Sequence, residues 1–253
     1  MGGLARRASL IEQTRDSVEG ALLVVDSGNT LMGDPLSLRS EGRVIVHAMN
    51  AMGYDALGVG TGELMKGPEV LRQRIGEATF PVLSANMVDR ASGEPVLEPY
   101  AIIERGGVRF GVIGITDASA LQGLESSWPG VTILEAKQTL SGYISEIDSQ
   151  VDLIVVLARM GSQDAASLAY GVPGIDVIVG GNERYVLTEA QTTGDTVFVQ
   201  AGYDGEWLGR LDLKPSEDGY ALKQHQILYM RPDVADNPEI KELVQRYYGE
   251  YPE

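Results

Sequence analysis

Short apolar segments that run into glycine-rich or polar loops recur along this chain, and stretches of helical periodicity lie between them. Apolar runs of this length are typical of strands buried on both faces, and helices between such strands are typical of crossovers in parallel sheets. Two further segments have the pattern of hairpins, 100–116 turning at Gly106-Gly107 and a second turning at 217–219, and hairpins join antiparallel strands. The sequence therefore predicts an α/β fold with mixed sheets. The predicted buried strands are 21–29, 56–63, 81–86, 151–161, 175–182 and 196–202.

The helical stretches complete one predicted domain. The chain has 253 residues, which is long enough for one large α/β domain and short for two. No internal repeat or linker-like change of composition interrupts it, so we expect a single domain over 1–253, with 236–253 as a C-terminal surface helix or tail. The predicted helices are 36–52, 68–78, 136–150, 163–170 and 238–248.

Charge and composition exclude several classes of function. Lys and Arg number 20 against 36 Asp and Glu, which gives a net charge of −16. This charge repels nucleic-acid backbones and anionic lipid surfaces, so neither is expected as a partner. The lack of cysteine excludes disulfides and zinc–thiolate sites. No apolar run reaches the ~20 residues of a membrane span, and the first residues lack the apolar core of a signal peptide.

Four loops that follow predicted strands are the candidate functional segments, because ligand sites in open α/β sheets collect at the carboxyl ends of strands. The loop GVGTGE is glycine-rich, but its spacing fits neither the dinucleotide-binding fingerprint nor the P-loop. The two histidines, His47 and His225, lie outside these loops, and no Ser–His–Asp constellation is available. The four loops are 26–29, 60–63, 158–161 and 180–184.

The order of several sequence blocks resembles the 5′-nucleotidase branch of the calcineurin-like metallophosphoesterases. The blocks are GGLARRASLI, LLVVDSGN with GDPLS, MNAMGYDALGVGTGE, FPVLSAN, GVRFGVIGIT, VPGIDVIVGG and VFVQAGYDGEWLGRLDL, from Gly2 to about Leu213. The resemblance implies a four-layer α/β/β/α sandwich with two mixed sheets. It also implies two divalent metal ions at the strand ends and hydrolysis of phosphate esters, usually of nucleotides, by a metal-activated water.

The chain departs from this family at every metal-ligand position that can be aligned. The family's first strand carries an Asp-x-His pair before the GG-x-AR block, whereas this chain starts at that block, so its first strand is expected to be missing. The metal-bridging Asp of the family falls on Asn29. Its Gly-Asn-His-Glu loop falls on 60–63, where Thr61 replaces the Asn ligand and Glu63 is kept. The Ser-His ligand pair falls on Ala158 and Arg159.

The last metal-binding motif of the family, Gly-His-x-His, falls on 181–184 and places Asn182 and Arg184 at the two His positions. Arg cannot lose its proton, so it can replace the charge of a metal ion but cannot ligate one. The sequence thus predicts no bound metal, no cofactor and no catalytic residue. The residues expected to line the former metal pocket are Asp26, Asn29, Thr61, Glu63, Arg159, Asn182 and Arg184.

The leading hypothesis is a catalytically degenerate 5′-nucleotidase-like domain that serves as a binding or scaffold module. In one version Arg159 and Arg184 form a basic pocket for a small anion. In the other they pair with Glu63, Asp26 or Glu183 and only fill the cavity. The alternative is a metal-dependent phosphoester hydrolase with a rebuilt site, such as one ion on Glu63 and Asp26.

Partner and location follow from the same resemblance. Without the family's first strand, a sheet edge would be exposed, and an exposed edge can pair with a strand of a partner protein or of a second copy. The family's separate C-terminal substrate domain is also expected to be absent. Because members of this branch are commonly exported, the resemblance implies an extracytoplasmic location, either periplasmic, cell-surface or secreted.

Overall fold

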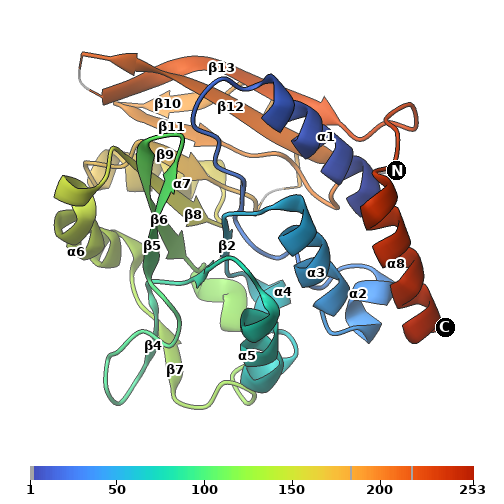
Figure 1. The fold of residues 1–253 in the computed structure, drawn as a ribbon. Coiled ribbons are helices and arrows are strands. Elements are labelled where there is room, and N and C mark those ends of the chain that lie inside the picture. Colours follow the sequence, from blue (N-terminus) through green and yellow to red (C-terminus); the bar gives the residue numbers. More distant parts are fainter. Residues whose placement is uncertain (1–2, 183, 218) are drawn as a thin grey trace.

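The computed structural model describes residues 3–182, 184–217 and 219–253. It is an α/β fold with mixed sheets, as predicted (Figure 1). The helices are α1 (Leu4–Ser17), α2 (Pro35–Arg39), α3 (Arg43–Met52), α4 (Thr61–Leu64), α5 (Gly67–Glu77), α6 (Ala136–Ile147), α7 (Ser162–Gly171) and α8 (Pro238–Glu250), with 3-10 helices η1 (Ala118–Leu121) and η2 (Asp148–Gln150).

The strands form two larger sheets and two ribbons. β1 (Val25–Asp26), β2 (Ala56–Gly58) and β3 (Val82–Leu83) make a parallel sheet in that order. The six-stranded sheet has the order β10-β11-β9-β8-β6-β5, with antiparallel strands only at its two edges. Its strands are β5 (Tyr100–Arg105), β6 (Val108–Ile115), β8 (Leu153–Ala158), β9 (Val177–Val179), β10 (Gln191–Thr193) and β11 (Thr196–Val199). The ribbons are β4 (Met87–Asp89) with β7 (Val131–Ile133), and β12 (Trp207–Ser216) with β13 (Gly219–Tyr229).

Three apolar cores hold these elements together. One lies between the two larger sheets and includes Leu83, Val112 and Leu157. A second packs α6 and α7 against the six-stranded sheet, and a third packs α1, α3, α5 and α8 against the other side of the three-stranded sheet. The inner strands β2, β6, β8, β9 and β11 are therefore mostly buried, which explains why they read as continuous apolar runs.

The predicted helix over 36–52 is wrong as a single element. The structure divides it into α2 and α3. The break occurs at Glu41 and Gly42, whose φ angles of 51° and 80° lie in the left-handed region. A residue in that region ends a right-handed helix, and glycine adopts it without the steric cost of a Cβ.

Helix α1 was not anticipated, and it contacts the C-terminal helix α8 (Figure 1). The predicted C-terminal helix is present as α8, and it buries Ile240 and Tyr247. The Tyr247 hydroxyl lies 2.7 Å from Nδ1 of His47 on α3. His47 therefore joins two helices, which agrees with the prediction that it takes no part in a catalytic loop.

Both predicted hairpins are present. β5 and β6 pair across Gly106-Gly107, from Arg105 opposite Val108 to Tyr100 opposite Ile113. β12 and β13 pair from Ser216 opposite Gly219 to Trp207 opposite Tyr229. The turn of this second hairpin includes residue 218, which lies outside the described residues. In the described parts of the chain, no helix is long and apolar enough to cross a bilayer.

The three-stranded sheet lies close against Gly114 on β6 of the six-stranded sheet. A Cβ atom at this position would overlap the Leu83 carbonyl group on β3. The absence of a side chain at Gly114 therefore allows the two sheets to lie this close together here.

We expect Gly114→Ala to destabilise the domain by about 3 kcal/mol, because the added methyl group must push the two sheets apart. Gly142→Ala is the matched control, since Gly142 lies within α6 with open space around its Cα, and alanine there favours the helix by ~0.5–1 kcal/mol. Urea unfolding of the two variants measures the difference. Equal stabilities would show that the sheet spacing is not fixed at this glycine.

Candidate functional site

The strand-end loops that the sequence singled out come together at one edge of the sheets. The loop after β1 contacts the loop after β9, because the Ser27 hydroxyl donates a hydrogen bond of 2.9 Å to the carbonyl of Gly180. The same loop lies against the loop after β2, where a Cβ on Gly28 would meet the Gly58 carbonyl oxygen at 2.7 Å. These contacts place the predicted site residues on neighbouring loops, as the carboxyl ends of parallel strands require.

Glu63, on α4, is the central acceptor of this loop cluster. Its Oε2 accepts hydrogen bonds from the backbone N–H groups of Asn29 (2.6 Å) and Gly60 (2.8 Å). Its Oε1 accepts from those of Thr30 (2.8 Å) and Leu31 (3.0 Å). The side chain is buried, with the residue 2% exposed. Burial raises the pKa of Glu63 above its ordinary value, and the four backbone donors oppose that rise.

Asn29 completes the junction between the loops after β1 and β2. Its backbone has a φ of 64°, a left-handed conformation that asparagine tolerates better than most residues. Its side-chain Oδ1 accepts a hydrogen bond of 2.6 Å from the N–H of Gly62. Asn29 and Glu63 thus bind each other's loops reciprocally. Their side-chain oxygens are engaged in these hydrogen bonds and would have to leave them to ligate a metal ion.

Arg159 follows β8 and crosses the site toward the loop after β9. Its Nη1 donates to the Gly181 carbonyl (3.1 Å) and to Oδ1 of Asn182 (3.3 Å). Burial lowers the pKa of Arg159 below its ordinary value, while the carboxylates of Glu63, Asp26 and Asp117 raise it. These carboxylates therefore stabilise the positively charged guanidinium of Arg159 electrostatically.

Arg184 lies outside this arrangement. Its side chain is 73% exposed and forms an ion pair of 2.9 Å with Asp204, and its guanidinium lies over the ring of Tyr203, 4.5 Å from the ring centroid. The described residues therefore pair Arg184 with Asp204 rather than with Glu63 or Asp26. Glu183, the third expected partner, lies outside the described residues.

The two remaining predicted residues lie at the rim of the cluster. Asp26 ends β1, and its Oδ1 accepts a hydrogen bond of 2.9 Å from the N–H of Gly28. Thr61 is the first residue of α4. The structure brings Asp26, Asn29, Thr61 and Glu63 onto two adjoining loops, with Arg159 reaching across them.

Two charged residues of the site were missed by the sequence reasoning. Asp117 follows β6 and is one of the carboxylates that act on Arg159; its place after the strand GVIGIT could have marked it. Arg7 on α1 acts on Asp26 and Tyr54, and these two neighbours raise the pKa of Arg7 against the lowering effect of its burial. No motif pointed to Arg7, because the N-terminal helix was not predicted.

The donor set does not fit two divalent metal ions. Among residues 3–182, 184–217 and 219–253 there is no group of three or more His, Cys, Asp or Glu side chains that could hold a metal. The Glu63 oxygens each accept two N–H donors, and a guanidinium occupies the space between the loops. A dinuclear centre needs several imidazole and carboxylate ligands converging on shared ions.

The chain is similar to known proteins over most of its length. No protein-family model matches the chain. The chain is 30% identical over 245 residues to the 5′-nucleotidase of Vibrio cholerae, covering 83% of this chain and 44% of that protein. The crystal structure of a 5′-nucleotidase precursor from Thermus thermophilus matches with a TM-score of 0.88 at 26% identity, covering 98% of this chain and 53% of that one.

The chain is therefore homologous to the catalytic domain of the calcineurin-like phosphoesterases. Its relatives include 5′-nucleotidases. The sulfate thiohydrolase SoxB of Thermus thermophilus shares the fold with a TM-score of 0.92 at 24% identity, covering 99% of this chain and 47% of that one. The chain spans about half the length of the proteins that it matches here.

We expect Glu63→Gln to destabilise the domain by about 2–4 kcal/mol. Either orientation of the amide would point an NH₂ group at two backbone N–H donors, which leaves buried donors without an acceptor. The control is Glu69→Gln on the exposed face of α5, where an ion pair between 68% exposed side chains is lost and the change should stay within about 0.5 kcal/mol. Thermal unfolding of both variants measures this, and equal stabilities would contradict a structural role for Glu63.

Proposed function

We propose that this chain is a catalytically degenerate 5′-nucleotidase-like domain that acts as a binding or scaffold module. We further propose that its architecture is the four-layer α/β/β/α sandwich with two mixed sheets. The observation that carries the functional proposal is the position of Arg159, a permanent cation between the loops that follow β1, β2 and β9. A guanidinium at this point provides positive charge without accepting any ligand.

The role proposed for Arg159 is electrostatic and structural. Asp26, Glu63 and Asp117 each act electrostatically on the Arg159 guanidinium, and a cation near carboxylates offsets their negative charge. In a dinuclear phosphoesterase the metal ions supply that cation. Here the Arg159 side chain supplies it and also links the loops after β8 and β9 through Gly181 and Asn182.

The alternative of a rebuilt metal-dependent hydrolase is less well supported. An ion held by Glu63 and Asp26 would compete with the four backbone N–H groups that Glu63 accepts. It would also lie near the guanidinium of Arg159, and like charges in a partly buried site disfavour each other. The hydrolase therefore remains the second candidate.

Elemental analysis of the chain purified with manganese and zinc supplied tests this choice. We expect far less than one metal ion per chain, and hydrolysis of bis(p-nitrophenyl) phosphate no faster than in a blank, because the ligand set for a dinuclear centre is lacking. An active metallophosphoesterase prepared in parallel is the control for loading and assay. About two ions per chain with turnover would overturn the proposal in favour of the hydrolase.

The version with a small-anion pocket predicts a different result from the version in which Arg159 only fills the cavity. Arg184 pairs with Asp204 and Tyr203, so of the two arginines of that version only Arg159 is left for an anion. We expect millimolar phosphate or nucleotide to leave the melting temperature unchanged, whereas a ligand that binds the native state must raise it. Sodium chloride at equal ionic strength is the control. A rise specific to phosphate would establish the pocket.

We also propose that this protein lies outside the cytoplasm, in the periplasm, at the cell surface or secreted. The similar 5′-nucleotidase of Thermus thermophilus is named a precursor, which supports export of that protein. Since the chain spans 44% of the Vibrio cholerae 5′-nucleotidase, the scaffold role is proposed for this domain.

A further inference from the structure

A groove of about 1000 Å³ lies outside the loop cluster, between α5, residues 78–82, residues 94–99 and Tyr143 on α6. None of the residues that line it belongs to the four strand-end loops. Its volume is at the upper end of the range of ligand pockets, about 300–1,000 Å³. The groove is therefore a separate hollow that is large enough to hold several side chains of a ligand.

The apolar lining of the groove is continuous with the core that packs the helices on the three-stranded sheet. Phe80 and Val82 belong to that core. Ile75, Val96 and Leu97 pack against it and are partly exposed. An apolar group that covers these side chains would extend the core, so the lining favours a ligand with apolar side chains.

Two residues of the lining have unpaired backbone groups. The N–H and C=O groups of Phe80 and of Leu97 form no hydrogen bond with another described residue. Phe80 and Leu97 lie on two segments that meet where Leu83 of β3 pairs with Glu98 in an isolated bridge. A bound peptide chain can satisfy such backbone groups in the way that an added strand does.

Prolines flank both of these residues. Pro81 follows Phe80 directly, and Leu97 lies between Pro95 and Pro99. Because proline has no N–H group, neither segment can continue as a regular strand ladder. The groove therefore suits one short extended segment rather than the edge of a whole sheet.

The rim of the groove carries negative charge. The side chains of Glu94 and Glu98 are exposed and form no ion pair with any residue that the structure describes. Arg72, which also lines the groove, is already paired with Glu69 on α5. Unpaired carboxylates beside an apolar surface favour an occupant that carries Lys or Arg.

Tyr143 connects this charge with α6. Burial raises the pKa of its hydroxyl above the ordinary value, and the carboxylates of Glu146 and Glu94 raise it further. Its ring contacts that of Tyr100, with 5.7 Å between the ring centroids. A cation bound beside Glu94 would therefore lie near an aromatic ring, which also attracts cations.

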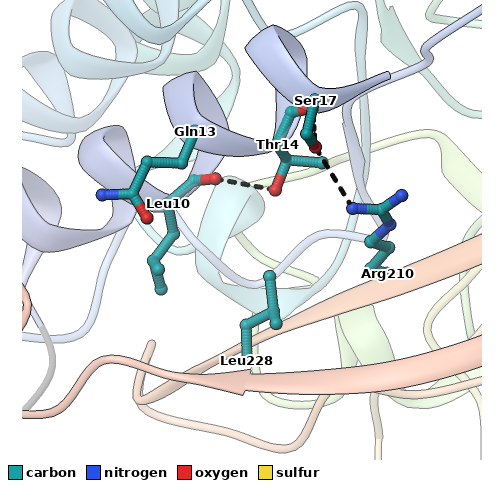
Figure 2. A pocket seen from close by; sticks show the side chains of 6 residues that line it. All are labelled: Leu10, Gln13, Thr14, Ser17, Arg210 and Leu228. Atoms are coloured by element: carbon teal, nitrogen blue, oxygen red, sulfur yellow. Dashed lines mark hydrogen bonds between the residues drawn. The ribbon is translucent and has the colours of Figure 1, made fainter. Parts of the chain in front are cut away.

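A second hollow, between α1 and the β12–β13 hairpin, lacks these features (Figure 2). Its volume is about 210 Å³. The Thr14 hydroxyl donates to the Leu10 carbonyl at 2.8 Å. Arg210 donates to the Ser17 hydroxyl at 3.5 Å and to Asp212 at 2.8 Å. These polar side chains are thus already engaged, which leaves the larger groove as the better site for a partner.

We propose that the larger groove binds a short extended segment of a partner protein in which apolar residues alternate with Lys or Arg. Alternate side chains of an extended chain point to opposite sides. The apolar side chains would cover Val96 and Leu97, and the basic ones would lie beside Glu94 and Glu98. The backbone of the segment would bond to the unpaired groups of Phe80 and Leu97.

A basic partner fits this groove better than a second copy of the chain. Two copies that each carry a net charge of −16 repel each other, whereas a basic segment is attracted. The proposal goes beyond the scaffold role of the loop cluster, because the groove shares no residue with that cluster. It holds whether or not the loop cluster binds metal.

The test uses a fluorescein-labelled peptide of about six residues in which Lys alternates with Val or Leu. We expect saturable binding to the full chain by fluorescence anisotropy, and about tenfold slower hydrogen exchange at the amides of Phe80 and Leu97. One control peptide has the same composition with its Lys residues in one block, and another has N-methyl groups on alternate residues, which remove backbone donors. Each should bind at least about tenfold more weakly.

Charge reversals in the chain locate the binding. Glu94→Lys combined with Glu98→Lys should weaken it at least about tenfold, because cations then replace both carboxylates at the rim. Glu19→Lys combined with Glu125→Lys changes the net charge equally at exposed positions outside the groove. This control should weaken binding less than about twofold, because salt screens distant charges. All four positions are exposed, so we expect both double variants to fold, which circular dichroism checks.

Three results would overturn the proposal. They are equal binding by the two double variants, equal binding of the alternating peptide and either control peptide, and unchanged exchange at Phe80 and Leu97. Slower exchange at these amides as the protein concentration rises, with no peptide present, would overturn it in favour of a second copy. All of these measurements are made without added metal, so their failure is distinct from failure of the proposed function.

Discussion

The Glu63 carboxylate is the interaction on which the arrangement of the strand ends depends. Four backbone N–H groups from two loops converge on it, and no other single side chain among the described residues accepts as many. Loops that follow parallel strands have few backbone partners of their own, and buried N–H groups must find an acceptor. When Glu63 accepts these N–H groups, it holds the left-handed backbone of Asn29 in place. The Arg159 side chain then lies between loops whose positions are fixed.

The fold was largely predictable, because its signals are local. Continuous apolar runs and the glycine pair at Gly106-Gly107 predicted the buried strands and the first hairpin, and both are present. The failures have physical reasons as well. The left-handed backbone at Glu41 and Gly42 divides a stretch whose apolar spacing continues without interruption. α1 carries two arginines early in its sequence, and its packing against α8 is a long-range contact that no local pattern reveals.

The candidate site was predictable only as a set of positions. The loops that carry Asn29, Glu63 and Arg159 were expected to meet, and they do. The roles of their side chains depend on which atoms face which, and spacing along a sequence does not encode that. Arg184 shows the difference: its position in the motif suggested the pocket, whereas the nearby Asp204 and Tyr203 draw it to the surface. Asp117 and Arg7 act from elements that no motif connected with the site.

A cation that is part of the polypeptide has a consequence for how the domain folds. When metal ions hold carboxylate loops together, the free energy of unfolding rises with the concentration of free metal, and chelators lower it. Arg159 cannot dissociate from the chain, so its positive charge offsets that of Asp26, Glu63 and Asp117 at any metal concentration. The loop cluster is thus assembled as soon as the chain folds, in surroundings rich or poor in divalent ions alike.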